Sequence, residues 1–345
     1  MQETFLQDEI VIDDNGKSSK NTFNLSSHRL AVVILSQMRT GSSVLGELFN
    51  QNPSFFYIFE PLWLVEKRPN VHLRLNLNTS FTKMIWATLN CDFSEFSKYT
   101  RSRSLFSFRS NRHVMQFCKE VLQRQPGECG LVLQPKIVPK LATYCNRIPY
   151  SALKTIRLLN IDSLKHYLND STIHLKIIHL VRDPRATFAS RIHLHTPRRA
   201  NGSEIEELCN WITRNTLNKN VSSQWQGRYT LVRYEDFADH PELITKKLYR
   251  FLGMPIHGDV LQWVKENTHK NKRHGPYSTG NHDAYANARK WRSLLSFHEV
   301  SRIQEICSQA MEVVGYKIAD SSETLSNLQT SLVGIIPQDV IAIRL

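Results

Sequence analysis

The sequence has 345 residues and a formal net charge of +13, with 44 Lys and Arg against 31 Asp and Glu. Its apolar share of 41% is ordinary for a globular protein and is enough for a sizeable core. The positive charge favours anionic partners, but the sequence has no zinc-finger spacing, RNP-like aromatic motif or low-complexity basic arm, so nucleic acid is not an expected partner.

The first 60 residues predict a leader and the start of an α/β domain. Residues 1–27 are polar and acidic, then rich in Ser and Asn, which is typical of a flexible leader. The apolar run 30–35 is short and rich in β-branched residues, as expected of a strand buried on both faces. A helix is expected at 43–50, and the aromatic run 55–59 indicates another strand.

Strands and helices alternate through the rest of the chain. Further strands are expected at 151–156, 175–181 and 229–232, and further helices at 158–168, 241–252 and 296–314. Residues 65–130 are basic and mostly helical in pattern, without a repeat. The alternation predicts one α/β domain, a central parallel sheet flanked by helices, over residues 28–318. The tail 319–345 receives no role from its sequence.

The cysteines and the sequons bear on the compartment. Six cysteines, at 91, 118, 129, 145, 209 and 307, show no CxxC pair or other metal-ligand spacing, so zinc is not expected. Their even number fits an oxidising compartment, with free thiols in a cytosolic enzyme as the alternative. Five Asn-x-Ser/Thr sequons, at 24, 78, 169, 201 and 220, lean toward a glycoprotein. No segment approaches the roughly 20 apolar residues of a membrane span, and no signal peptide is present, so we expect either a cytosolic protein or a missing targeting segment.

The first candidate site is the turn between the first strand and its helix, residues 36–43. Its backbone N–H groups and the helix dipole favour a dianion, and Gly41 permits a close approach. Ser42 and Ser43 can donate hydroxyls, and Arg39 offers a two-pronged guanidinium. A nucleoside triphosphatase loop carries Gly-Lys-Ser/Thr, whereas here the basic residue precedes the glycine and nothing is arranged for a metal. The turn predicts a phosphate site other than that of ATP, with an ordinary strand–helix turn as the alternative.

The second candidate site follows the buried strand expected at 175–181. That strand ends in Arg182, and Ser190 lies two turns into the next helix, so both can converge on one anion at the carboxyl edge of the sheet. Arg185 and Arg191 would then flank the anion. A simple helix-capping role for the intervening acidic turn is the alternative.

The two sites together resemble the cofactor motifs of the Golgi carbohydrate sulfotransferases, which bind 3′-phosphoadenosine 5′-phosphosulfate (PAPS). The galactose/N-acetylgalactosamine/N-acetylglucosamine 6-O-sulfotransferases look most similar, above all the chondroitin 6- and keratan sulfate members. The similar stretches are Arg39-Thr-Gly-Ser-Ser43, Gly46-Glu-Leu-Phe-Asn-Gln51, Phe59-Glu-Pro-Leu-Trp63, Lys154-Thr-Ile-Arg157, Leu231-Val-Arg-Tyr-Glu-Asp236, Tyr249-Arg-Phe-Leu-Gly253, Trp291-Arg292, and the spaced Ile303-Gln304, Cys307 and Gly315-Tyr316. They extend over about 30–318, essentially the whole expected domain.

The chain departs from the family pattern in three places. Leu64 stands where members usually carry His, the N-terminal signal-anchor is absent, and the segment between the two motifs matches poorly. These departures concern the histidine's role, membrane attachment and the identity of the acceptor.

The resemblance implies sulfuryl transfer from PAPS, without a metal, to the 6-hydroxyl of a Gal, GalNAc or GlcNAc residue in a glycan or glycosaminoglycan of the chondroitin or keratan kind. It implies a place in the Golgi lumen, with membrane contact only through an anchor that this sequence does not contain. Arg39, Thr40, Gly41, Ser42 and Ser43 would hold the 5′-phosphosulfate, with Arg39 offsetting charge on the bridging oxygen. Arg182 and Ser190 would hold the 3′-phosphate.

The acceptor hydroxyl also needs a base, and Glu60 is the candidate. It ends an apolar run beside the first turn, where partial desolvation suits a general base. The alternative role is to hold Arg39 or another arginine in place. Lys154, Arg157 and Arg292 are weaker candidates for support of the acceptor or cofactor.

Two other functions remain open from the sequence. A kinase with an atypical phosphate loop would need Lys and Mg²⁺ ligands that we do not find. A catalytically silent protein with the same fold could bind a nucleotide or a sulfated glycan. Leu64 permits that function, whereas the presence of Arg39, Glu60, Arg182 and Ser190 argues against it.

Overall fold

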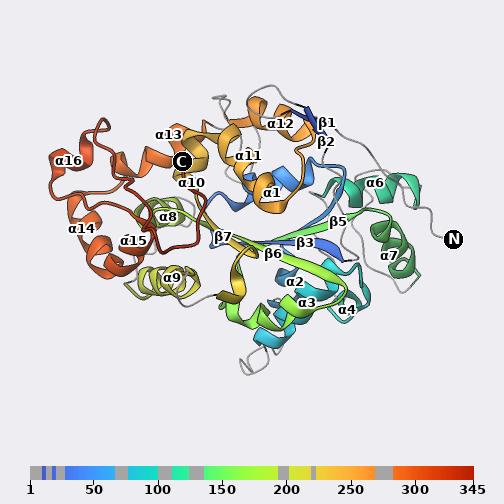
Figure 1. The fold of residues 1–345 in the computed structure, drawn as a ribbon. Helices are drawn as coiled ribbons and strands as arrows, with labels where there is room; N and C mark the ends of the chain where they lie inside the picture. Colours follow the sequence, from blue (N-terminus) through green and yellow to red (C-terminus); the bar gives the residue numbers. More distant parts are fainter. Residues whose placement is uncertain are drawn as a thin grey trace.

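The computed structural model describes residues 10–12, 18–20, 28–66, 77–99, 111–123, 136–192, 202–218, 223–268 and 283–345. At its centre is a parallel five-stranded sheet in the order β4-β5-β3-β6-β7 (Figure 1). The strands are β3 (Arg29–Leu35), β4 (Phe55–Phe59), β5 (Tyr150–Thr155), β6 (Ile173–Val181) and β7 (Tyr229–Arg233). The predicted α/β class and parallel sheet are confirmed.

The register of the strands brings the two sequence motifs to one edge of the sheet. Leu35, the last residue of β3, pairs with Thr155 of β5 and with His179 of β6. Phe59, the last residue of β4, pairs with Lys154. Because the strands are parallel and in this register, the segments that follow β3, β4, β5 and β6 all begin at the same carboxyl edge.

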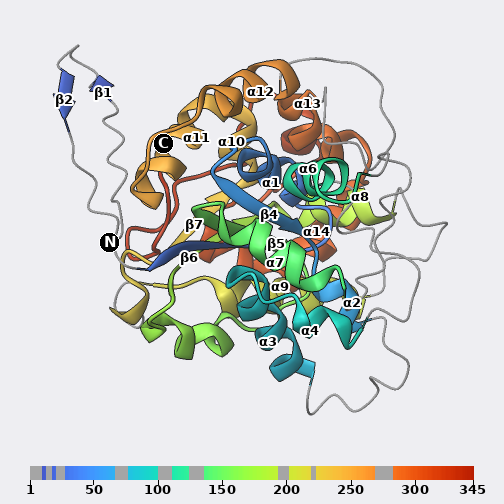
Figure 2. The same ribbon diagram turned by 90° about the vertical axis from the view of Figure 1, so that its right-hand side faces the viewer.

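Alternate residues of the central strand pack on opposite faces of the sheet. Ala31, Val33 and Leu35 point into one core, while Val32 and Ile34 point into the other. The first core is completed by α3 (Leu77–Leu89), α9 (Gly202–Asn215), α14 (Phe297–Ile306) and α15 (Ser308–Val314). The second is completed by α1 (Ser42–Asn50), α11 (Pro241–Leu252), α12 (Gly258–Thr268) and α13 (Ala284–Arg289). Figures 1 and 2 show these two helical layers on either side of the sheet.

Shorter elements fill the connections. They are α2 (Leu62–Glu66), α4 (Ser94–Ser97), α6 (Arg112–Glu120), α7 (Val138–Asn146), η3 (Ile161–Asn169), α8 (Pro184–Ile192), η4 (Ser223–Trp225), α10 (Tyr234–Asp239), η5 (Lys290–Ser293) and α16 (Ser322–Ser326). In the expected leader, β1 (Ile10–Ile12) pairs antiparallel with β2 (Ser18–Lys20), and the remainder of residues 1–27 lies outside the described ranges. No helix in the described part is both long and apolar enough to cross a membrane.

Two helix predictions differ from the structure. The helix expected over 296–314 is two helices, α14 and α15, which meet at Cys307, where the backbone leaves the helical region. The helix expected over 158–168 is the 3₁₀ helix η3, which begins three residues later. Asn160 caps η3 by accepting a hydrogen bond from the Asp162 N–H, and the Asn215 side chain accepts one from the Ile161 N–H. By contrast, α11 spans the predicted residues and ends at Gly253.

The tail after residue 318 packs against the domain. Its residues Leu325, Leu332, Ile336 and Val340 belong to the core on the α3 side of the sheet. Its backbone also pairs beside β7, where the Leu231 N–H donates to the Ile341 carbonyl at 3.0 Å. The tail therefore has a structural role that its sequence did not indicate.

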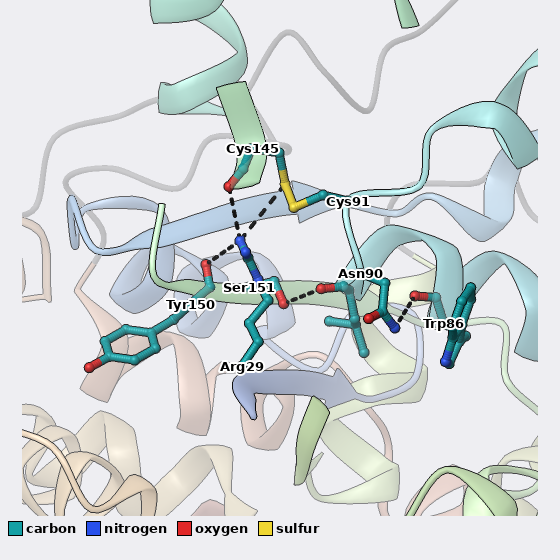
Figure 3. The surroundings of a disulfide bond; sticks show 8 residues. Arg29, Trp86, Asn90, Cys91, Cys145, Tyr150 and Ser151 are labelled. Carbon is teal, nitrogen blue, oxygen red and sulfur yellow. Dashed lines mark hydrogen bonds between the residues drawn. A yellow bond between two sulfur atoms is a disulfide. The ribbon is translucent and has the colours of Figure 1, made fainter. Parts of the chain in front are cut away.

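Disulfide bonds connect distant helices. Cys91, after α3, is bonded to Cys145 in α7, and the Arg29 guanidinium donates to the Cys145 carbonyl at 3.0 Å (Figure 3). Cys209 of α9 is bonded to Cys307 at the break between α14 and α15. None of the cysteines in the described ranges is free. This agrees with the expected oxidising compartment and not with a set of cytosolic free thiols.

Candidate active site

The turn after β3 has an unusual backbone conformation that hydrogen bonds hold in place. Arg39 and Gly41 both have positive φ, 72° and 90°. The Ser36 N–H donates to the Thr155 carbonyl at 3.1 Å, and the Thr40 hydroxyl donates to the Gln37 carbonyl at 2.8 Å. The turn leads directly into α1, where the Val44 and Leu45 N–H groups donate to the Gly41 carbonyl at 3.0 and 3.2 Å. The N–H groups of Ser42 and Ser43 begin the helix, a position that suits an anion.

Gly41 is required by close packing as well as by its dihedral angle. A Cβ atom at this position would lie 2.3 Å from Cδ2 of Tyr234, which follows β7. The Tyr234 ring also lies under the Arg182 guanidinium, at 4.7 Å from its centroid. Tyr234 thus contacts both sequence motifs. In the sequence, Tyr234 belongs to the family-like stretch Leu231–Asp236, and no role was assigned to it there.

Arg182 is directed at the first turn. Its NH1 group donates to the Arg39 carbonyl at 3.0 Å, and its NH2 group donates to the Asn287 carbonyl at 2.7 Å. Its side chain is buried, and among the described residues its Nε has no hydrogen-bond partner. A buried guanidinium N–H without a protein acceptor fits an anionic ligand.

Arg39 and Ser190 join the two motifs. The Arg39 Nε donates to the Ser190 hydroxyl of α8 at 3.1 Å. The structure therefore brings Arg39, Arg182 and Ser190 together with the N-terminus of α1, as the sequence predicted for two motifs at one edge. Their individual roles remain predictions.

The two flanking arginines differ in position. Arg191 lies against the turn, with its Nε donating to the Met38 carbonyl at 3.3 Å. The expectation that Arg185 flanks the anion is wrong. Arg185 is fully buried, forms a two-pronged pair with Asp183, and donates from NH1 to Gln304 at 2.7 Å. Its charge is balanced inside the fold by Asp183, because burying a charge without a partner is costly.

Glu60 lies at the end of β4 with a positive φ of 51° and a buried carboxylate. Its Oε1 lies 2.5 Å from Lys154 Nζ, and its Oε2 pairs with Arg157 NH1. Burial lowers the pKa of Lys154, and Glu60 acts against that shift. The structure thus unites Glu60, Lys154 and Arg157, and Arg157 is an arginine that Glu60 holds. Within the described ranges, no group of three His, Cys, Asp or Glu side chains is arranged to hold a metal ion.

Arg292 faces the C-terminal segment. Its guanidinium is buried and donates to four backbone carbonyls, those of Thr324, Leu325, Asn327 and Thr330. These contacts give Arg292 a structural role, because they hold the C-terminal segment in place. That Arg292 supports the acceptor or the cofactor stays a prediction.

Glu235 is a buried acid that the sequence did not single out as special. Its Oε1 accepts a hydrogen bond from the Asp183 N–H at 3.1 Å, and its Oε2 accepts one from the Tyr316 hydroxyl at 2.7 Å. Burial, with a contribution from the nearby Asp183 charge, raises the pKa of Glu235 to about 7. Glu235 therefore supports the backbone immediately after Arg182.

Comparison with known proteins identifies the family of the chain. A model of the sulfotransferase family matches residues 31–258. Carbohydrate sulfotransferase 1 of Mus musculus is 30% identical over 353 residues, which covers 90% of this chain and 85% of the relative. Carbohydrate sulfotransferase 3 of Tetronarce californica is 30% identical, covering 88% and 76%. Among solved structures, the sulfotransferase domain of the Synechococcus PCC 7002 olefin synthase has a TM-score of 0.47 and 18% identity, over 86% of this chain and 98% of that one. The chain belongs to the sulfotransferase family and is an enzyme of the carbohydrate sulfotransferase group.

Proposed function

We propose that this sulfotransferase moves a sulfuryl group from PAPS to the 6-hydroxyl of a Gal, GalNAc or GlcNAc residue in a glycan. The observation that carries the proposal is the junction of the two motifs, in which Arg182 donates to the Arg39 carbonyl and Arg39 donates to Ser190. A donor with a 3′-phosphate and a 5′-phosphosulfate has two anionic ends, and this arrangement has a cationic group and hydroxyls for each.

The donor half of the site acts by position and charge. The N-terminus of α1 and the hydroxyls of Ser42 and Ser43 suit the 5′-phosphosulfate, and the buried Arg182 Nε suits the 3′-phosphate. In the reaction the acceptor oxygen forms a bond to sulfur while the bond from sulfur to the bridging phosphate oxygen breaks. Arg39 offsets the negative charge that the leaving oxygen gains, as arginine does in phosphoryl transfer.

The acceptor half of the site centres on Glu60. Its carboxylate accepts the proton of the attacking hydroxyl, and Lys154 and Arg157 hold it in position at the end of β4. The contact between the Glu60 N–H and the Lys154 carbonyl, at 2.9 Å, fixes the backbone of the same pair.

The disulfides and the family support a secretory-pathway enzyme, for which we propose the Golgi lumen and a chondroitin- or keratan-like acceptor.

The test is transfer of radiolabelled sulfate from PAPS to desulfated chondroitin and desulfated keratan, followed by disaccharide analysis of the product. Label on a 6-hydroxyl is the expected result. Label at another position would refute the proposed 6-hydroxyl as the site of transfer, but would still show sulfuryl transfer from PAPS.

A catalytically silent protein of this fold makes a different prediction. Such a protein would bind 3′-phosphoadenosine 5′-phosphate (PAP) in a titration but would label no acceptor of the panel. That outcome would overturn the proposed function.

A further inference from the structure

Arg157 joins a buried acid to an exposed one at the edge of the acceptor half. Its NH1 contacts Glu60, and its Nε contacts the Glu66 carboxylate at 2.9 Å. The Arg157 side chain is 16% exposed, Glu60 7% and Glu66 49%. Arg157 thus extends from the interior to the surface between two carboxylates.

The charges of this cluster are distributed unequally between the interior and the surface. Among the described residues, Glu60 is paired with the buried Lys154 as well as with Arg157, so this part of the cluster contains two cations and one anion. Within the same described residues, the Glu66 carboxylate is the further anion that pairs with Arg157. Glu66 is the last residue of α2 and extends toward solvent.

The outer pair costs little to separate. An ion pair with a half-exposed carboxylate contributes little to stability, because water solvates the carboxylate nearly as well as the guanidinium does. Breaking the inner pair would leave a charge buried without a partner and is much more costly. An external anion can therefore replace Glu66 on Arg157 while the contacts of Glu60 persist.

The position of Arg157 suits an acceptor group. β4 and β3 are separated by β5, so the ends of these strands are roughly 10 Å apart at the usual strand spacing. Arg157 follows β5, the strand between β4 and β3, so its backbone lies between Glu60, which follows β4, and the proposed sulfuryl site after β3. An acceptor whose hydroxyl lies between Glu60 and the first turn can extend over Arg157.

We propose that Arg157 is a specificity-determining residue that binds an acidic group of the glycan acceptor, a carboxylate or a sulfate ester, in the place that Glu66 takes in the free protein. The inference rests on the proposed function and specifies its substrate as an acidic glycan. A planar guanidinium binds either oxyanion through two N–H groups.

The experiment compares Glu66→Gln and Arg157→Gln with the wild type on three oligosaccharides that share one acceptor sugar. One is neutral, one carries a carboxylate and one carries a sulfate on the neighbouring sugar. Glu66→Gln is expected to lower KM for the acidic acceptors at least threefold and to leave KM for the neutral one unchanged. Arg157→Gln is expected to abolish the preference for acidic acceptors, measured as the ratio of their KM values to that of the neutral acceptor. Because Arg157 also pairs with Glu60, this variant can lower kcat for all three acceptors without affecting that comparison. The carboxylate and sulfate arms tell which group is bound.

Asp162→Asn is the matched control. Asp162 pairs with Lys165 at 2.9 Å on the surface of η3 and is 50% exposed, so the change alters net charge as Glu66→Gln does, at another place. If Asp162→Asn lowers KM for acidic acceptors as much as Glu66→Gln, general electrostatics explain the effect and the inference is wrong. Equal KM changes for neutral and acidic acceptors in the Glu66 variant would also refute it.

A binding measurement separates this inference from the proposed function. Titration of the PAP-bound protein with the three oligosaccharides needs no turnover. If the wild type transfers no sulfate but binds the acidic oligosaccharides in an Arg157-dependent manner, the proposed function fails and the inference stands. If it transfers sulfate without any Arg157-dependent preference, the inference fails alone.

Discussion

Arg39 and Glu60 have the same backbone anomaly. Both lie in the left-handed region, where a side chain other than that of Gly, Asn or Asp is disfavoured. Such conformations persist where the surrounding contacts impose them, and they concentrate at functional sites. Here the contacts are visible: Arg182 binds the Arg39 carbonyl, and Lys154 binds both the carboxylate and the N–H of Glu60.

The first prediction concerns Glu60→Gln. We expect turnover to fall at least 100-fold, because the amide cannot accept the proton of the acceptor hydroxyl. PAP affinity should stay near that of the wild type, because the donor is held by the residues after β3 and β6. Initial rates and a PAP titration provide the two readouts. Retained turnover would show that Glu60 is not the base.

The second prediction concerns Gly41→Ala, with Gly253→Ala as its control. Both glycines have positive φ, so each alanine costs about 1–2 kcal/mol in the free energy of unfolding. Only at Gly41 does the new Cβ collide with a ring, that of Tyr234, whereas at Gly253 nothing lies within 4 Å. The collision adds about 1–3 kcal/mol and displaces the turn. We expect Gly41→Ala to unfold at lower denaturant and to lose PAP binding, and Gly253→Ala to retain binding. Equal behaviour of the two variants would contradict the packing argument.

At the scale of the elements, the regular parts were predictable and the irregular parts were not. The β-branched run of β3 and the Pro- and Gly-bounded helix α11 follow local rules, and both were predicted within a residue. The break at Cys307 could not be predicted, because the apolar spacing of α14 continues into α15. η3 was mistaken for an α-helix because its caps, Asn160 and Asn215, come from a turn and a distant helix.

The third prediction concerns the disulfide at that break. Cys209 and Cys307 are 98 residues apart in the sequence, so their bond restricts a long loop of the unfolded chain. We expect the double variant Cys209→Ala/Cys307→Ala to lose about 2–5 kcal/mol in the free energy of unfolding. Urea unfolding of the variant and the wild type under non-reducing conditions measures the difference. An unchanged midpoint would mean that the packing of α9 against α14 and α15 alone holds these helices.

At the scale of the whole molecule, the sequence indicated that the site lies at the carboxyl edge of the sheet, but not which strands and side chains surround it. Two motifs after buried strands predicted one site, because the carboxyl ends of parallel strands share an edge. The strand order, which puts β5 between β4 and β3, depends on tertiary packing and was not predicted. The same applies to Glu235 of α10 and Tyr316, which follows α15, because their side chains come together only in the folded structure. Of residues 98–124, in the segment predicted to be basic, 98–99 and 111–123 lie within the described ranges and the rest lie outside them.

The fourth prediction is a pH dependence of stability that Glu235 produces. The pKa of Glu235 in the folded protein is about 7, above its ordinary value of 4.5, so the folded state binds the proton more tightly than the unfolded state. The stabilisation is complete below about pH 4.5 and is lost as the pH rises through 7. Glu235→Gln removes this loss, so the difference in unfolding free energy, variant minus wild type, should increase from pH 4.5 to pH 7.5.

Burial of His179 also makes the stability depend on pH in this interval, because His179 binds a proton more readily in the unfolded chain than in the fold, so the variant and the wild type must be compared. Burial lowers the pKa of His179 to about 3, which acts in the opposite direction in both proteins and cancels in the difference. Glu312→Gln on the exposed face of α15 is the control, because it removes a carboxylate that is not buried. A Glu235→Gln difference that is flat from pH 4.5 to 7.5 would contradict the assignment.

The hydrogen bonds that join Arg182, Arg39 and Ser190 have a consequence for how a two-ended ligand comes and goes. Once one anionic end is bound, the other is delivered to its partner at a high effective concentration, and the avidity exceeds that of either contact by roughly 10²–10⁴-fold. With the proposed donor, the desulfated nucleotide keeps both anionic ends, so we expect the same residues to retain it. We therefore expect release of the spent nucleotide, rather than the transfer itself, to limit turnover.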